Sequence, residues 1–166
     1  VALGDSIIGI NAKSDIVQRM TEEFESSKAD IVVAFEEVPK ADVVRYGIAK
    51  PRGEVGTRFE LEDLIEKPSV EEAPSQYAVA SRYVFSPAIF EAIEETKPGK
   101  GGEIQLTDAI RILLKRGAKG VGMVLPPGER RFDIGNYGSY FRAFADFALA
   151  DPDYGDQLRD YLRGVL

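Results

Sequence analysis

The stretch Leu64-Ile65-Glu66-Lys67-Pro68 decides how the fold is interpreted, because an apolar run ends there in a carboxylate, an ammonium group and a proline. Neighbouring strand residues point to opposite faces, so Glu66 and Lys67 cannot both be buried on one core. Proline cannot donate to a strand ladder, so the strand stops at Pro68. Open α/β sheets bind ligands at the carboxyl ends of strands, and an acid beside a base suits a ligand with hydroxyls and a phosphate. On this stretch alone, a solvated surface dipeptide is the simpler interpretation.

Predicted strands and helices alternate on both sides of this stretch. A continuous apolar run at 30–38 is typical of a strand covered on both faces. The alternation predicts an α/β fold with a mostly parallel or mixed sheet and helices on both faces. The expected strands are 1–3, 30–38, 46–49, 55–67, 77–85, 121–125 and 132–133, and the expected helices begin at Ser14, Ser86, Ile104, Tyr140 and Asp151.

Composition limits the chemistry. The 166 residues are 44% hydrophobic, which suffices for one ordinary domain with a core. The sequence contains neither cysteine nor histidine, which excludes thiolate and imidazole metal ligands and the Ser-His-Asp triad. A metal ion must therefore be held by oxygen atoms, as magnesium, manganese or calcium is.

Charge and hydropathy limit the partners. The net charge of −7 argues against binding to nucleic acid or to an anionic membrane, since both require a basic patch. No apolar run is long enough to span a bilayer, and no secretory signal is visible. The lack of cysteine fits a reducing compartment, so we expect a cytoplasmic protein.

Two carboxylates follow short apolar segments. Asp5 comes directly after the predicted strand 1–3, and Asp133 follows Phe132 and precedes Gly135. Two carboxylates at strand ends with a lysine nearby are the minimum for magnesium-dependent phosphoryl or nucleotidyl transfer. Both aspartates are equally well explained as residues that cap turns.

Glycines mark further candidate positions. Gly47, after Tyr46, leaves room for a backbone N–H to meet a ligand hydroxyl, although a plain strand-end glycine is the simpler interpretation. A glycine hinge opens the stretch 101–108, in which Thr107 or Asp108 can cap the following helix. Capping leaves Glu103 and Gln105 unexplained. No glycine-rich phosphate-binding loop of a known pattern is present.

Taken together and in this order, the motifs resemble those of the bacterial UTP–glucose-1-phosphate uridylyltransferases. The Glu-Lys-Pro and Tyr-Gly elements are shared with related sugar-phosphate nucleotidyltransferases, and the Glu-Ile-Gln-Leu-Thr-Asp-Ala-Ile string is more specific. The matching stretches are Ala2–Asp5, Arg45–Gly47, Leu64–Pro68, Ser81–Phe85, Gly102–Ile110 and Phe132–Asn136.

The resemblance implies a Rossmann-like, three-layer α/β/α nucleotidyltransferase fold with a mixed sheet, incomplete at the N-terminus. It also implies an enzyme that makes UDP-glucose and pyrophosphate from UTP and glucose 1-phosphate. By position, Asp5 and Asp133 would bind Mg²⁺, and Lys67 would hold the sugar phosphate and the transferring phosphoryl group. Glu66 would accept from sugar hydroxyls. The remaining substrate-binding residues by this resemblance are Tyr46, Gly47, Val79, Ala80, Arg82, Tyr83 and Glu103.

The chain also departs from the family pattern. Asp5 is followed by Ser6 where the family usually has paired aspartates, and the family's glycine-rich loop for UTP phosphates is not found. The chain begins at Val1 without methionine, so we expect residues upstream and expect the 166-residue chain alone to be inactive. We assign residues 1–150 to the sugar-phosphate-binding part of a nucleotidyltransferase domain and 151–166 to a C-terminal helix, and we expect a homo-oligomer.

Two other functions fit the same residues. One is a related enzyme that forms a dTDP- or ADP-sugar, because the residues that read the base are not among the matched stretches. The other is a non-catalytic fragment that binds a sugar phosphate.

Overall fold

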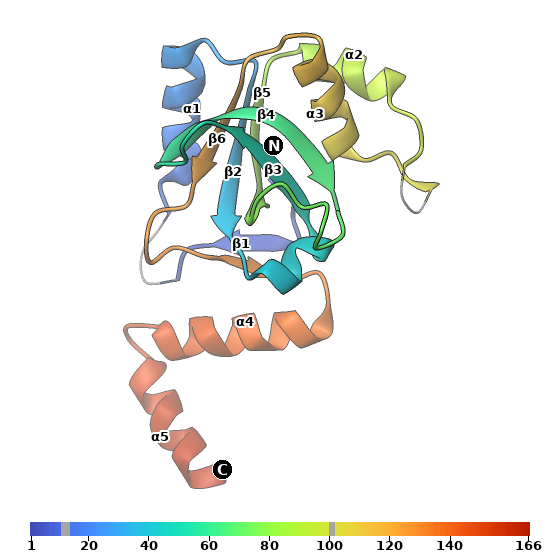
Figure 1. Cartoon of the computed structure of the whole chain (residues 1–166). Helices are drawn as coiled ribbons and strands as arrows, with labels where there is room; N and C mark the ends of the chain where they lie inside the picture. Colours follow the sequence, from blue (N-terminus) through green and yellow to red (C-terminus); the bar gives the residue numbers. More distant parts are fainter. Residues whose placement is uncertain (11–13, 100–101) are drawn as a thin grey trace. The chain divides into compact units, whose positions relative to one another are not determined.

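The chain forms two units, which the computed structural model describes over residues 1–10, 14–99 and 102–166 (Figure 1). The first, here called the sheet unit, comprises Val1–Ala2 and Asp15–Pro126. The second, here called the helical unit, comprises Leu3–Ser14 and Pro127–Leu166. Gly101, which opens the predicted glycine hinge, lies outside the described residues.

Five strands of the sheet unit close on themselves in the order β2-β5-β3-β4-β6. β6 completes the ring by pairing in parallel with β2, and the other pairings in this ring are antiparallel. The predicted α/β class with a mixed sheet is therefore confirmed, with parallel pairing confined to β2 and β6 in this ring. The strands are β2 (Ile31–Glu37), β3 (Gly47–Arg52), β4 (Arg58–Glu66), β5 (Tyr77–Phe85) and β6 (Gly120–Val124).

β3 and β4 form a hairpin that brings two of the predicted site positions together. Gly47 at the start of β3 lies opposite Glu66 at the end of β4. The register shifts between Lys50 and Pro51, where proline has no N–H to donate. Pro51-Arg52-Gly53 is a turn signal in the sequence, but Pro51 and Arg52 belong to β3, and the chain turns at Gly53, whose φ of +77° suits glycine.

Helices pack on the outside of the ring (Figure 1). α1 (Ile16–Ser27) lies along β2 and β5. Ile16, Met20 and Phe24 recur every four residues, which predicts one apolar stripe on this helix, and Ile16 and Met20 are buried. α3 (Leu106–Lys115) packs on β4, with α2 (Ala88–Glu95) beside it. A short 3₁₀ helix, Lys40–Arg45, links β2 to β3.

The helical unit is built on a two-stranded sheet. β1 (Ser6–Ile8) pairs antiparallel with β7 (Arg131–Asp133), so that Ser6 lies opposite Asp133. Phe132 packs its ring 4.9 Å from that of Phe147 on α4 (Tyr137–Ala150), and α5 (Gly155–Val165) follows. No helix within the described ranges is both long and apolar enough to cross a bilayer.

The first residues differ from the prediction. Val1–Leu3 is not a buried strand: Ala2 makes an isolated bridge to Arg82, and Val1 exchanges two backbone hydrogen bonds with Tyr83. Pairing on one side only leaves Leu3 40% exposed. Asp5 therefore precedes β1 instead of following a strand.

Two helix starts are also shifted by one residue. Asp15, not Ser14, occupies the N-cap of α1, because the Ser14 hydroxyl donates to Glu129 at 2.5 Å. Pro87, not Ser86, is the N-cap of α2. The predicted functional division at residue 150 stays a prediction; by contact, α4 and α5 belong to the same unit as β1 and β7.

Gly122 on β6 cannot carry a side chain without displacing the aromatic ring of Phe59, which lies opposite it on β4. A Cβ at this position would come within 2.3 Å of Phe59 Cζ, and Phe59 packs against Phe35 in the core with ring centroids 5.3 Å apart. We expect Gly122→Ala to lower the free energy of unfolding by about 1–3 kcal/mol through overpacking. Urea unfolding measures the change. Gly56→Ala is the control, since the nearest atom there is 3.9 Å away, and equal losses in both variants would contradict the packing argument.

The exposed side of the β3–β4 hairpin carries a row of opposite charges. Lys50 donates to Glu62 at 2.6 Å, and Arg52 lies 3.8 Å from the same carboxylate. The hydrogen bond from Lys50, followed by the charges of Lys50 and Arg52, outweighs desolvation and lowers the pKa of Glu62.

A lowered folded-state pKa stabilises the fold above the unfolded pKa, and this contribution is lost as pH falls through the folded pKa. In Lys50→Met we therefore expect the Glu62 pKa to rise toward its ordinary value. Carboxyl NMR titration of both proteins measures the shift. An unchanged Glu62 pKa in the variant would show that Lys50 is not the cause.

Candidate functional site

Glu66 ends β4 with its carboxylate held from the neighbouring helix. The Thr107 hydroxyl on α3 donates to Glu66 Oε2 at 2.7 Å. The Glu66 side chain is 16% exposed, so this carboxylate is largely withdrawn from water. Thr107 itself is buried. Its hydroxyl therefore supplies a hydrogen bond that a half-buried carboxylate needs.

Thr107 does not act as the helix cap that the sequence suggests. Gln105 occupies the N-cap of α3, and Thr107 lies within the first turn. The helix-start pattern of Thr107-Asp108 cannot distinguish a cap from a contact to another element. Only the packing of α3 on β4 reveals that the hydroxyl serves Glu66.

Lys67 follows with a left-handed backbone. Its φ is 44°, and its N–H donates to the Tyr46 carbonyl at 2.9 Å. The left-handed residue breaks the strand alternation, and Lys67 Nζ lies 3.7 Å from Glu66 Oε1. The ammonium group is exposed while the carboxylate is mostly enclosed.

Gly47 borders the cluster formed by Glu66 and Thr107. A Cβ at Gly47 would come within 3.3 Å of Glu66 Oε2, Thr107 Oγ1 and Val79 Cγ2. A side chain there would press on both members of the Thr107–Glu66 hydrogen bond. The predicted contact of the Gly47 N–H with a ligand hydroxyl stays a prediction; the structure shows that Glu66, Thr107 and Val79 border Gly47.

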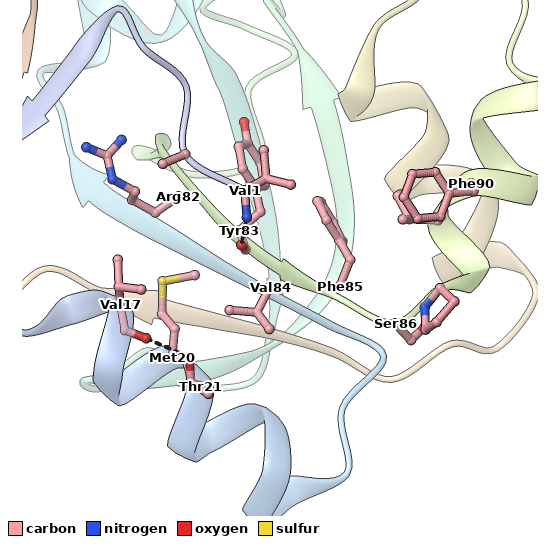
Figure 2. A pocket seen from close by; sticks show the side chains of 13 residues that line it. Val1, Val17, Met20, Thr21, Arg82, Tyr83, Val84, Phe85, Ser86 and Phe90 are labelled. Carbon is pink, nitrogen blue, oxygen red and sulfur yellow. Dashed lines mark hydrogen bonds between the residues drawn. The ribbon is translucent and has the colours of Figure 1, made fainter.

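The other substrate-binding residues predicted on β5 follow Val79 along the strand. Ala80 is fully buried, and Ser81 has a φ of 57° where the β2–β5 register shifts. Arg82 and Tyr83 line a cavity of about 480 Å³ between α1, α2 and β5, together with Val1 and Phe90 (Figure 2). Neither Glu66 nor Lys67 lines that cavity, so in this structure Arg82 and Tyr83 border a different space.

Tyr46 and Glu103 are the two remaining residues predicted to bind substrate. The Tyr46 side chain is half-buried, with the Arg45 guanidinium 5.5 Å above its ring. Glu103 is exposed in the loop before α3, where its carbonyl accepts from Gly99 at 2.9 Å. The roles assigned to both by resemblance stay predictions.

In the helical unit, Asp5 and Asp133 lie next to each other. The Asp5 carbonyl accepts from the Ile134 N–H at 2.8 Å, and Asp133 Oδ1 accepts from the Gly135 N–H at 2.8 Å. A Cβ on Gly135 would come within 3.3 Å of Asp133 Oδ1 and 3.6 Å of Asp5 Oδ2. Both carboxylates therefore border the same small volume, which a side chain at residue 135 would fill.

This pair suits a hard cation that keeps part of its water shell. Mg²⁺ is usually bound by one or two carboxylates together with substrate phosphates, so two aspartates and no nitrogen or sulfur ligand fit it. Among residues 1–10, 14–99 and 102–166, no group of three or more acidic residues forms a complete cage. The structure thus brings together Glu66, Lys67, Gly47 and Val79 in one unit, and Asp5 with Asp133 in the other.

Known proteins resemble this chain in sequence and fold. A family profile described as nucleotidyl transferase matches residues 3–149. A Bacillus subtilis protein named UTP–glucose-1-phosphate uridylyltransferase is 36% identical over 168 aligned residues, which cover 100% of this chain and 55% of that protein. The chain therefore spans about half the length of the curated relatives it matches.

Solved structures agree. A crystal structure of UDP-glucose pyrophosphorylase complexed with UDP-glucose superposes with a TM-score of 0.77 at 34% identity, covering 86% of this chain and 52% of that one. A structure described as UTP-bound UGPase from Acinetobacter baumannii gives a TM-score of 0.82 at 28% identity, covering 97% of this chain and 54% of that one. The resemblance to uridylyltransferases predicted from the motifs is confirmed.

Proposed function

Because the chain belongs to the nucleotidyl transferase family, we propose that it supplies sugar-phosphate-binding and metal-binding residues for making UDP-glucose and pyrophosphate from UTP and glucose 1-phosphate. One observation carries the proposal: Glu66 and Lys67 present an acceptor and a cation 3.7 Å apart at the end of β4. Glucose 1-phosphate has hydroxyls and a phosphate that match this pair.

Within the pair, the two side chains have different tasks. Glu66 Oε2 is engaged by Thr107, which leaves Oε1 facing Lys67 as the oxygen to accept from a sugar hydroxyl. The exposed Lys67 ammonium group binds the phosphate as a point charge. Gly47 has no side chain to press on this carboxylate, since a Cβ there would come within 3.3 Å of Oε2.

Asp5 and Asp133 are the residues that would hold Mg²⁺. When bound, the ion would neutralise phosphate charge and favour in-line attack. Support for this assignment is that both carboxylates border the volume that a side chain at Gly135 would fill. The Gly135 N–H fixes Asp133 Oδ1, so the carboxylate is oriented before any ion arrives.

The reaction needs positioning more than proton transfer. A phosphate oxygen of glucose 1-phosphate attacks the α-phosphorus of UTP, the new P–O bond forms as the bond to the β-phosphate oxygen breaks, and pyrophosphate leaves. No covalent enzyme intermediate is involved, which fits a chain without cysteine or histidine. Lys67 contributes by holding and neutralising the phosphate oxygens.

The remaining roles are proposed by resemblance alone. We assign Tyr46, Ala80, Arg82, Tyr83 and Glu103 to the surroundings of the substrate. We also propose a cytoplasmic homo-oligomer; the exposed rings of Tyr137, Phe141 and Phe144 on α4 support self-association.

Two alternatives differ from this proposal in the full-length protein. A related enzyme would use another nucleotide or sugar, and a non-catalytic protein would bind glucose 1-phosphate without turnover even at full length. The 166 residues contain no glycine-rich phosphate loop, so we expect this chain by itself to bind the sugar phosphate without releasing pyrophosphate.

The direct test combines a binding titration with an assay. Glucose 1-phosphate is titrated into the ¹⁵N-labelled chain, and pyrophosphate release is measured with UTP and Mg²⁺, with the Bacillus subtilis relative as the positive control. Ligand shifts at residues 47 and 66–67 are expected. Turnover by the chain alone would show that the site has been misassigned, and absence of any shift would overturn the proposed function.

Lys67→Met tests the phosphate contact. Removing the charge while keeping most of the side-chain length should weaken glucose 1-phosphate binding by at least about tenfold, as expected for a lost hydrogen bond to a charged group. Lys28→Met is a matched control, because Lys28 is also a left-handed lysine, with a φ of 52°, at the end of α1. NMR titration measures both affinities. Equal affinity in the two variants would remove Lys67 from the site.

Asp133→Asn tests the metal pair. We expect Mn²⁺, used as a paramagnetic probe, to broaden the Gly135 amide signal of the wild-type chain, and we expect the variant to need at least about tenfold more ion. Asp156→Asn, which changes a fully exposed carboxylate on α5, is the control. Broadening that is unaffected by the Asp133 change would place the ion elsewhere.

A further inference from the structure

Thr107 is joined to Glu66 by a hydrogen bond whose direction is fixed by chemistry. An ionised carboxylate only accepts, so the threonine hydroxyl must donate across the 2.7 Å between Oγ1 and Oε2. Such a bond is charge-assisted and stronger than one between neutral groups. The contact joins residues 41 positions apart in sequence, so it exists only when α3 is packed on β4.

The surroundings leave the Glu66 carboxylate little freedom. Oε2 accepts from Thr107, and a Cβ added at Gly47 would come within 3.3 Å of it. The same ideal Cβ position is 3.3 Å from Val79 Cγ2. One oxygen of the carboxylate is thus held from α3, and the other, Oε1, lies 3.7 Å from Lys67 Nζ.

A second contact fixes the helix that carries Thr107. Arg111, one turn further along α3, makes a two-pronged ion pair with Asp63 on β4, with 3.0 Å from Nε to Oδ1 and 3.3 Å from Nη2 to Oδ2. Paired guanidinium and carboxylate planes restrict orientation as well as distance. α3 is therefore held against β4 at two points, and Thr107 cannot easily slide away from Glu66.

We propose that Thr107 is a positioning residue for sugar recognition: its hydroxyl holds Glu66 so that Oε1 is presented to a hydroxyl of the hexose. The inference rests on the proposed function, because it assigns Thr107 to the acceptor side of the same site. Thr107 makes the site sensitive to the sugar ring and leaves the phosphate contact of Lys67 unaffected. Discrimination between hexose phosphates and simpler phosphate monoesters depends on it.

The experiment compares two ligands on the chain. Glucose 1-phosphate carries ring hydroxyls and a phosphate, whereas methyl phosphate carries only the phosphate. Thr107→Val keeps the branched shape and removes the donor. We expect it to weaken glucose 1-phosphate binding about tenfold and to leave methyl phosphate binding within about twofold. Thr107→Ser, which keeps the donor, should retain wild-type affinity for glucose 1-phosphate.

Thr96→Val is the control for removing a buried threonine hydroxyl. Thr96 is also buried, and its hydroxyl donates to the Ala92 carbonyl at 2.7 Å on α2. It should change neither affinity. Thr107→Ala, which creates a gap without placing a new methyl group, provides a second variant if Thr107→Val does not fold.

The outcomes separate this inference from the proposed function. If the wild-type chain binds glucose 1-phosphate and Thr107→Val binds it equally well, Thr107 is not a positioning residue. Equal weakening of both ligands would also overturn the inference, since it would show a general loss of structure. A wild-type chain that does not bind glucose 1-phosphate overturns the proposed function itself, and the inference with it.

Discussion

The site in the sheet unit depends on one half-buried carboxylate. Removing a charged group from water is costly unless hydrogen bonds replace the lost solvation, so the position of Glu66 constrains everything that touches it. The Thr107 hydroxyl supplies one such hydrogen bond, Gly47 leaves open the space beside the carboxylate, and the Lys67 ammonium group lies 3.7 Å from Oε1. They come from α3, from β3 and from the residue that follows β4. A change in the packing of any of these elements would therefore alter the surroundings of the Glu66 carboxylate.

The left-handed backbone of Lys67 places its ammonium group near the Glu66 carboxylate at the end of β4. In a regular strand, consecutive side chains point to opposite faces, and an adjacent acid and base would diverge. With a φ of 44°, Lys67 leaves the strand direction, and its ammonium group lies 3.7 Å from Glu66 Oε1. A non-glycine residue in this region costs free energy, which the hydrogen bond from its N–H to the Tyr46 carbonyl helps to offset. Strain of this kind is often found where geometry serves binding.

Several features follow from local sequence, and others do not. The apolar run of β2, the aromatic strand β5 and the stripe of α1 were predictable, because each depends on a short repeating pattern. The end of β4 at Glu66 was predictable from Pro68. Thr107 was not, because helix-start chemistry explains it equally well and its partner is distant in sequence. The ring closure of β6 on β2 and the single bridge at Ala2 likewise depend on non-local pairing.

The phosphate-ester binding proposed for this acidic chain must rely on short-range contacts. The net charge of −7 opposes the approach of a dianion, and salt screens that repulsion beyond about 8 Å at physiological ionic strength. Specific recognition therefore comes from groups in direct contact: a lysine held by its backbone, and a carboxylate whose orientation is set by neighbouring elements. The same reasoning applies to Asp5 and Asp133, whose carboxylates border one small volume in which we propose that a cation is held. On this account, the acidity of the chain suits metal-assisted phosphate chemistry, because a divalent ion supplies the positive charge that the protein surface lacks.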